Sequence, residues 1–196
     1  ISFFFLKDSK LLEDGALLLV SDNKERRLKK SFEKIKDLLS RYFVGLVFQI
    51  LIVFIIYTIV LLIFGIKNAV VIAFLCALLN LIPYIGPLIG GVLMLILSMS
   101  SNLGMDFQTV ILPKTTYVMI GYAIAQLVDN FVSQPLIFSN SVKSHPLEIF
   151  LVIIIGGLLF GVVGMIIAVP TYTALKVISK EFLSDNKIVK KITEGI

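Results

Sequence analysis

The chain has 196 residues, of which 58% are hydrophobic and only 16% charged, with a net charge of +5. Ordinary soluble domains are about 45–50% apolar and about 25% charged, so the composition excludes that class and indicates an integral membrane protein. The apolar stretches exceed the ~20 residues that a membrane helix needs, and none shows the ~10-residue alternation of a barrel strand. We therefore predict an all-α, polytopic membrane protein.

Residues 1–6 look like the end of a truncated apolar segment, and residues 7–41 are the one substantial polar region. Asp22 and Glu25 have the spacing of an N-cap and an N3 acid. The helix predicted from there has an apolar stripe at spacings of three and four, formed by Leu28, Phe32, Ile35, Leu39 and Tyr42. Its other face is mostly Lys and Arg. Such a cytoplasmic amphipathic helix can lie on anionic headgroups or form a seam between subunits, and we expect no nucleic-acid binding.

Residues 42–178 form the predicted transmembrane domain. Its first span covers residues 42–66, in which Gln49 and Thr58 are the only clearly polar side chains. The single cysteine, Cys76, allows neither a disulfide framework nor a cysteine metal site, so we interpret it as a small buried hydrophobe.

The apolar run of residues 69–99 is interrupted by the octet Asn80-Leu-Ile-Pro-Tyr-Ile-Gly-Pro87. Pro83 and Pro87 lack backbone N–H groups and push the residues before them out of the α region, while Gly86 is free to take a positive φ. We therefore predict a broken helix, either a kinked span or a re-entrant hairpin. Opened backbone at membrane depth is tolerated only where protein buries it or where it lines a cavity.

The octet is thus a candidate lining of a transport path, with Asn80 and Tyr84 as its polar side chains. Gly86 and Gly90 form a GxxxG pair, which predicts the close approach of another helix.

The run of residues 107–138 carries a polar cluster. Pro113-Lys114 predicts an early interruption, so that a span of residues 117–138 places Gln126, Asp129 and Asn130 near mid-membrane, with Gln134-Pro135 beyond. A carboxylate at the bilayer centre costs ~2.5 to 3.5 kcal/mol, so it normally faces a partner, a cavity or an ion path. A span of residues 107–128 instead would leave Asp129 at the interface.

A short polar connection then holds His145, either a proton relay or a structural residue whose ring bonds the loop backbone, before Pro146. The following apolar run, residues 147–178, contains further helix breakers, namely Gly156, Gly157, Gly161, Gly164 and Pro170. Gly157 and Gly161 form a GxxxG pair and predict close packing with a second kink or break. Two interrupted segments are typical of secondary transporters, whose broken helices mark binding sites.

The basic residues predict the orientation of the chain. Only Lys67, Lys114 and Lys143 lie between Arg41 and Lys176, so the positive-inside rule places both basic flanks, including the tail of residues 179–196, in the cytoplasm. An even number of crossings must lie between them. Four would fit one crossing per apolar run, and a re-entrant hairpin would change that count.

Three blocks of residues resemble the autoinducer-2 exporter family of bacterial permease-like membrane proteins. The first two are Arg41-Tyr-Phe-Val-Gly-Leu-Val-Phe-Gln49 and Leu81-Ile-Pro-Tyr-Ile-Gly-Pro87. The third runs from Gln126-Leu-Val-Asp-Asn130 through Gln134-Pro-Leu136, His145-Pro146, Gly156-Gly157 and Gly161-Val-Val-Gly164 to Ala168-Val-Pro170. The resemblance extends over residues 31–182 and implies further spans before Ile1. It also implies a bacterial inner-membrane location, a homo-oligomer, with a pentamer as one option, and export of autoinducer-2 or exchange of sodium or lithium for protons.

We therefore expect a secondary transporter of a small solute or a monovalent cation, without cofactor or metal centre. Asp129 would carry the coupling, and the neutral polar contacts would come from Asn80, Tyr84, Gln126, Asn130 and Gln134. The alternatives are a passive oligomeric channel and a scaffold that recruits partners through residues 24–41. An enzyme is not expected, since the sequence has neither HExxH nor GxSxG.

Overall fold

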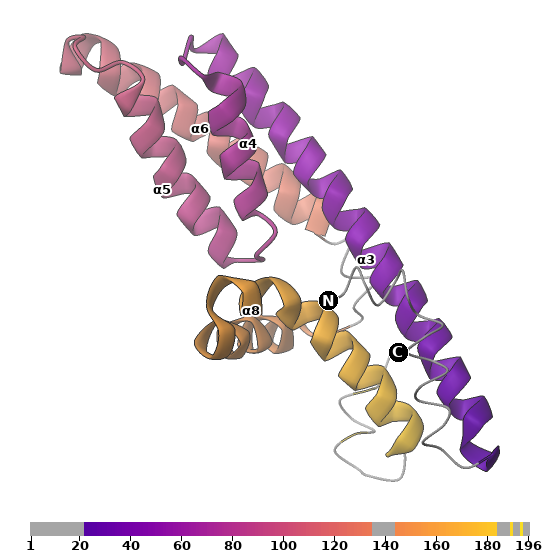
Figure 1. Ribbon diagram of the computed structural model, residues 1–196. Helices are drawn as coiled ribbons and strands as arrows, with labels where there is room; N and C mark the ends of the chain where they lie inside the picture. The colour runs from indigo at the N-terminus through magenta and orange to yellow at the C-terminus, as the bar shows by residue number, and fades with distance from the viewer. Residues whose placement is uncertain (1–21, 135–143, 184–188, 190–192, 194–196) are drawn as a thin grey trace. The chain divides into compact units, whose positions relative to one another are not determined.

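The computed structural model describes residues 22–134, 144–183, 189 and 193. All regular elements within these residues are helices, which confirms the predicted all-α class (Figure 1). The chain divides into two compact units, one made of Ile1–Val44 and Ile137–Ile196 and the other of Gly45–Leu136. Helix α3 contributes to both.

Helix α3, Asp22–Ile63, is one continuous helix of 42 residues. At ~1.5 Å per residue it is about 63 Å long, twice the hydrocarbon thickness of a bilayer. It ends before the predicted Ile66 because Gly65 takes φ 62°. The Ile66 N–H then donates to the Leu61 carbonyl at 2.9 Å and the Gly65 N–H to the Leu62 carbonyl at 3.0 Å, which is the Schellman pattern of a helix end.

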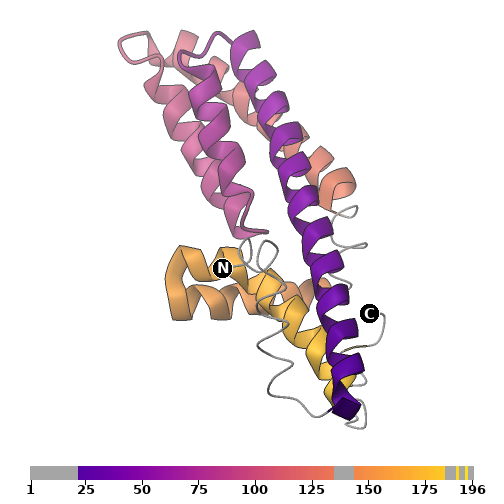
Figure 2. The same ribbon diagram turned by 45° about the vertical axis from the view of Figure 1, so that its right-hand side comes forward.

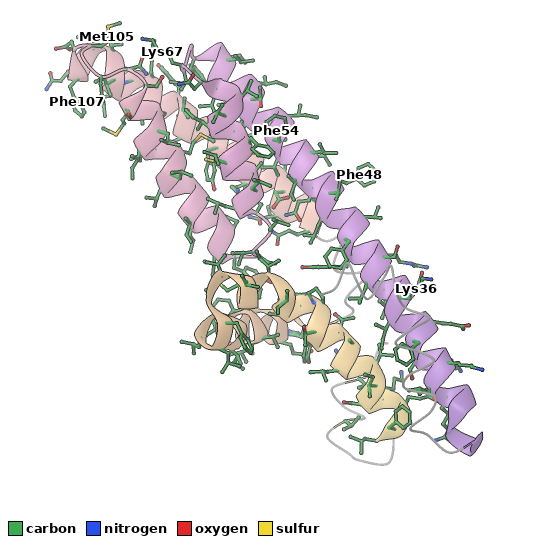
Figure 3. All side chains as sticks on the ribbon, in the orientation of Figure 1. Lys36, Phe48, Phe54, Lys67, Met105 and Phe107 are labelled. Atoms are coloured by element: carbon green, nitrogen blue, oxygen red, sulfur yellow. The ribbon has the colours of Figure 1, made fainter. Side chains whose placement is uncertain are left out.

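Helices α4, Ala69–Leu79, and α5, Ile85–Ser100, form an antiparallel hairpin (Figure 1). The Lys67 backbone N–H donates to Ser101 Oγ at 2.7 Å, which joins the start of α4 to the end of α5. Figure 3 accordingly shows Lys67 and Met105 at the same end of these helices. At ~1.5 Å per residue α4 is about 16 Å long and α5 about 24 Å, so neither reaches across ~30 Å of hydrocarbon.

The octet forms the bend of this hairpin. Pro87 has no N–H to donate to the Pro83 carbonyl, which instead accepts from the Ile85 N–H at 2.8 Å. This closes a γ-turn centred on Tyr84, whose φ of 65° and ψ of −51° belong to its rare, strained form. Immediately beyond it, Gly86 lies against the Leu79 backbone carbonyl, where no Cβ would fit.

The segment from Phe107 to Ser133 is continuous helix, with π turns at Phe107–Ile111 (η1) and Asp129–Ser133 (η2) on either side of α6, Leu112–Val128. The predicted interruption at Pro113-Lys114 is wrong, because the helix continues through these residues and only changes from π to α geometry at Leu112, just before Pro113. Asp106 caps η1 by accepting hydrogen bonds from the Thr109 hydroxyl and backbone N–H, and these hold the pKa of Asp106 below its usual range.

The core of the unit Gly45–Leu136 lies where α4, α5 and α6 pack with the second half of α3. Its buried residues include Val53, Tyr57, Leu61, Ala73, Cys76, Ala77, Met94, Val118 and Ala125. Large apolar side chains also cover its outer surface, among them Phe48, which is 63% exposed and points away from the neighbouring helices in Figure 3. An apolar exterior around a packed core is what a lipid environment requires.

Helix α8, Pro146–Phe182, bends back on itself at Phe160 and Gly161, which take non-helical backbone angles (Figure 2). Gly156 lies against the Gly164 carbonyl and Gly157 against Met165, so the two legs run antiparallel from the bend. Near their other end, the Lys176 ammonium lies 3.2 Å from Glu148 Oε2. The bend at Phe160 ends the first leg, residues 146–159, which is about 21 Å long at ~1.5 Å per residue.

Two predictions about this run are corrected. The backbone departs from helix geometry at Phe160 and Gly161 alone, whereas Pro170 lies inside the second leg. Gly156, Gly157 and Gly164 all pack closely, as predicted for Gly157, whereas Gly161 occupies the bend and takes φ 61°. A glycine whose role is to let the two legs pack closely can keep helical backbone angles.

The predicted apolar stripe of α3 is covered within the chain. Ile35, Leu38 and Leu39 pack with Val177 of α8, and Tyr42 is also buried. The opposite face, which includes Lys36 and Arg41, is exposed. The stripe therefore serves the core of the unit that contains α8.

By length and composition alone, three of the described helical segments could cross a membrane: Arg27–Ile63, Phe107–Ser133 and Pro146–Phe182. The bend in α8 shortens the third along its axis.

Candidate functional site

A buried carboxylate lies where α3 meets the end of α6. Asp129 is 0% exposed, and its Oδ2 atom accepts hydrogen bonds from Gln49 Nε2 at 2.9 Å and from Gln134 Nε2 at 3.2 Å. Gln134 Nε2 also donates to Asn130 Oδ1 at 2.8 Å. We call these four residues the carboxylate cluster.

The π turn η2 accounts for the position of Gln134. A π helix places the residue five positions on, rather than four, above a given residue. The Gln134 backbone N–H donates to the Asp129 carbonyl in this pattern, so the two side chains lie together. Single π turns inside helices occur frequently at functional sites.

Only one of the two carboxylate oxygens of Asp129 accepts hydrogen bonds from the described residues. Asp129 Oδ1 is buried and has no hydrogen-bond partner among the described residues, and no described Lys, Arg or His forms an ion pair with Asp129. Burial of an unpaired charge is costly, and carboxyl groups in such places normally take up a proton or a cation. The free oxygen is where such an ion would bind.

A second group, which we call the amide–tyrosine cluster, joins the octet to α3 and α6. It consists of Tyr57, Asn80, Tyr122 and Gln126. Gln126 Nε2 lies 2.6 Å from Tyr57 Oη and 3.2 Å from Tyr122 Oη. The same nitrogen lies 3.4 Å from Asn80 Oδ1. Tyr122 Oη donates to the Pro87 carbonyl at 2.6 Å, and the two tyrosine rings stack with centroids 5.1 Å apart.

The structure thus brings Asn80 to Gln126, and Asp129 to Gln134 and Asn130. Tyr84 lies at the bend of the hairpin, outside both clusters, and is 36% exposed. His145 is the N-cap of α8, where its Nδ1 accepts from the Leu147 N–H at 3.3 Å, in line with the structural alternative for this residue. Pro135 lies outside the described residues.

Sequence reasoning missed three residues of the clusters: Gln49, Tyr57 and Tyr122. The signal was present in helical spacing, since Gln49 and Tyr57 fall eight residues apart on one buried face of α3. Tyr122 and Gln126 of α6 and Asp129 at the start of η2 follow at spacings of four and three. Polar residues that recur on one face of an apolar helix indicate a shared partner.

The described residues contain no group of three or more His, Cys, Asp or Glu side chains that could hold a metal ion. The groups that face Asp129 Oδ2 are amide N–H donors rather than ligand oxygens.

Long apolar helices whose outer surfaces carry apolar side chains define an integral membrane protein. The chain belongs to the AI-2E transporter family: the model described as "AI-2E family transporter" matches residues 1–184. Two relatives from Bacillus subtilis (strain 168) are each 31% identical to it. "Putative transport protein YrrI" aligns over 181 residues, 92% of this chain and 49% of its own length. "Putative transport protein YueF" aligns over 193 residues, 97% of this chain and 48% of its own length.

The chain therefore spans about half the length of these curated relatives. No solved structure matches it.

Proposed function

We propose that this chain is part of a secondary transporter in the bacterial inner membrane. It moves a small polar solute, such as an autoinducer-2-like signal, or a monovalent cation, and Asp129 carries the coupling ion. The observation that carries the proposal is the fully buried Asp129 carboxylate with one oxygen unpaired among the described residues. A purely structural carboxylate would be expected to have both oxygens satisfied.

The amide–tyrosine cluster supports a solute path beside the octet. Asn80 and Gln126 provide amide groups next to two phenol groups, inside helices whose other surfaces are apolar. Such groups hydrogen-bond a polar solute without adding charge. The bend at Tyr84 brings strained backbone to the same hairpin, and strained backbone concentrates at ligand-binding sites.

The hairpins give the topology of this proposal. α3 and the Phe107–Ser133 segment each cross the bilayer once, while the α4–α5 hairpin and α8 re-enter and return to the side from which they start. Two crossings then separate Arg41 from Lys176. Both basic flanks lie in the cytoplasm, as the positive-inside rule expects.

Flux measurements on the natural protein in proteoliposomes test this function. We expect autoinducer-2, sodium or lithium to move against its own gradient when a proton or sodium gradient is imposed. Solute movement that ignores every imposed ion gradient would fit a passive oligomeric pore instead. Absence of flux for all three solutes under every gradient would contradict transport of the proposed substrates.

A further inference from the structure

We propose that Gln49 is a positioning residue for Asp129: it holds one carboxylate oxygen so that the other alone takes up and releases the coupling proton. This deepens the proposed function of Asp129 and rests on it. Gln49 lies on α3, 80 residues before Asp129 in the chain, and is itself 4% exposed.

The two carboxylate oxygens have different surroundings. Gln49 Nε2 and Gln134 Nε2 both donate to Oδ2, the first from α3 and the second from the end of η2. Two donors on one oxygen fix the orientation of the carboxyl plane. Oδ1, also buried, has no hydrogen-bond partner among the described residues and is the atom left for exchange. The buried hydroxyl of Ser133, at the end of η2, is the other polar group beside the carboxyl.

The chemistry of the neighbours favours a proton over a metal cation. The amides of Gln49 and Gln134 present nitrogen, not oxygen, to Asp129. Cations such as sodium need several oxygen ligands, whereas a proton needs one lone pair. Oδ1 supplies that lone pair.

Gln49 also sets the pH at which the proton leaves Asp129. A hydrogen bond from an amide N–H stabilises the charged carboxylate more than the neutral acid. Removing the Gln49 donor therefore keeps Asp129 protonated up to higher pH. A residue that only joined α3 to α6 would affect stability and leave the pH dependence unchanged.

The test is an infrared titration of the natural protein reconstituted in lipid, which follows the carboxylic-acid C=O stretch. Asp129→Asn identifies the band by its disappearance. Gln49→Leu removes the donor, and Gln49→Glu keeps the size of the side chain while adding a second carboxyl group. Thr58→Val is the matched control, because Thr58 lies on the same helix and, among the described residues, donates its hydroxyl to the Phe54 carbonyl alone.

We expect the midpoint of the Asp129 band in Gln49→Leu to move toward alkaline pH by about 1 to 2 pH units, the worth of one hydrogen bond to a charged group. Gln49→Glu should move it at least as far, since two adjacent carboxyl groups share one proton. Thr58→Val should leave it unchanged. The pH profile of coupled flux should move with the band.

An unmoved midpoint in Gln49→Leu and Gln49→Glu would overturn the assignment of Gln49, as would the absence of any band that Asp129→Asn removes. The failure of the proposed function looks different. If Asp129→Asn retained coupled flux, Asp129 would leave the transport mechanism, while the titration would still decide whether Gln49 controls its protonation.

Discussion

Tyr122 connects the octet to α6 through a single hydroxyl group. Its Oη donates to the Pro87 carbonyl at 2.6 Å and also lies 3.2 Å from Gln126 Nε2. Gly90 and Gly91 of α5 lie against the same side chain. Removing the hydroxyl takes this donor from the Pro87 carbonyl, whereas Gln126 Nε2 keeps Tyr57 Oη and Asn80 Oδ1.

Tyr122→Phe should therefore destabilise the protein by about 0.5 to 1.5 kcal/mol, the net contribution of a typical hydrogen bond. Thermal or denaturant unfolding in detergent measures the change. Tyr117→Phe is the control, because Tyr117 is 53% exposed and contacts Phe64 through its ring. Equal stability of both variants would show that the Pro87 contact contributes nothing.

At the scale of single residues, the sequence predicted the residues that are unusual for their local surroundings, but it did not predict the residues that they contact. Asp129 stands out as a carboxylate within an apolar run, and Asn80 as an amide before a doubled proline. Gln49 and Tyr57 share one face of α3, but that spacing alone does not identify their partners. Their roles depend on contacts 80 and 69 residues apart in the chain, which no local pattern encodes.

At the scale of elements, the two hairpins differ in how they bend. The α4–α5 bend is fixed by prolines, which remove N–H groups and were visible in the sequence. The α8 bend needs one positive φ, and four nearby glycines could each supply it. The packing of the two legs of α8 decides that the positive φ occurs at Gly161, while Gly156 and Gly164 keep helical backbone angles.

The open end of the α8 hairpin is held by Lys176. Its side chain is 2% exposed, while that of Glu148 is 33% exposed, and Tyr172 Oη also donates to Glu148 Oε2 at 2.8 Å. Lys176 Nζ further donates to Ser144 Oγ at 3.0 Å. A buried ammonium that loses its carboxylate keeps its burial cost, whereas an apolar side chain of similar size does not.

Glu148→Gln should thus destabilise the protein by about 2 kcal/mol, reduced from a fully buried pair by the exposure of Glu148. Adding Lys176→Met should recover part of this loss, and unfolding of the single and double variants measures the coupling. Glu33→Gln, at an exposed position of α3, is the control and should change stability by less than about 0.5 kcal/mol. A double variant less stable than Glu148→Gln would contradict this account of the pair.

At the scale of the whole molecule, the proposed topology has two crossings instead of four, and both numbers are even. Four crossings and two crossings both return the chain to its starting side, so charge alone could not distinguish them. Whether the chain crosses two or four times depends on the lengths of α4, α5 and the legs of α8. The sequence does not predict these lengths, because each apolar run is long enough for a full span.

Cysteine labelling tests the proposed topology. Cys76→Ala removes the single native thiol, and Leu103→Cys and Leu183→Cys then place one thiol each at positions that are 77% and 54% exposed. A membrane-impermeant maleimide should label Leu103→Cys in intact cells and Leu183→Cys only after permeabilisation. Labelling of both from one side would refute the two-crossing topology.

The central claim is that the buried carboxylate of Asp129 couples transport to an ion gradient. Gradient-driven solute flux in proteoliposomes should fall to background in Asp129→Asn, because an amide cannot take up or release the ion. It should persist in Asp106→Asn, which alters an exposed carboxylate. If Asp129→Asn, folded and inserted as the natural protein is, kept the same gradient-driven flux, the coupling role of Asp129 would be wrong.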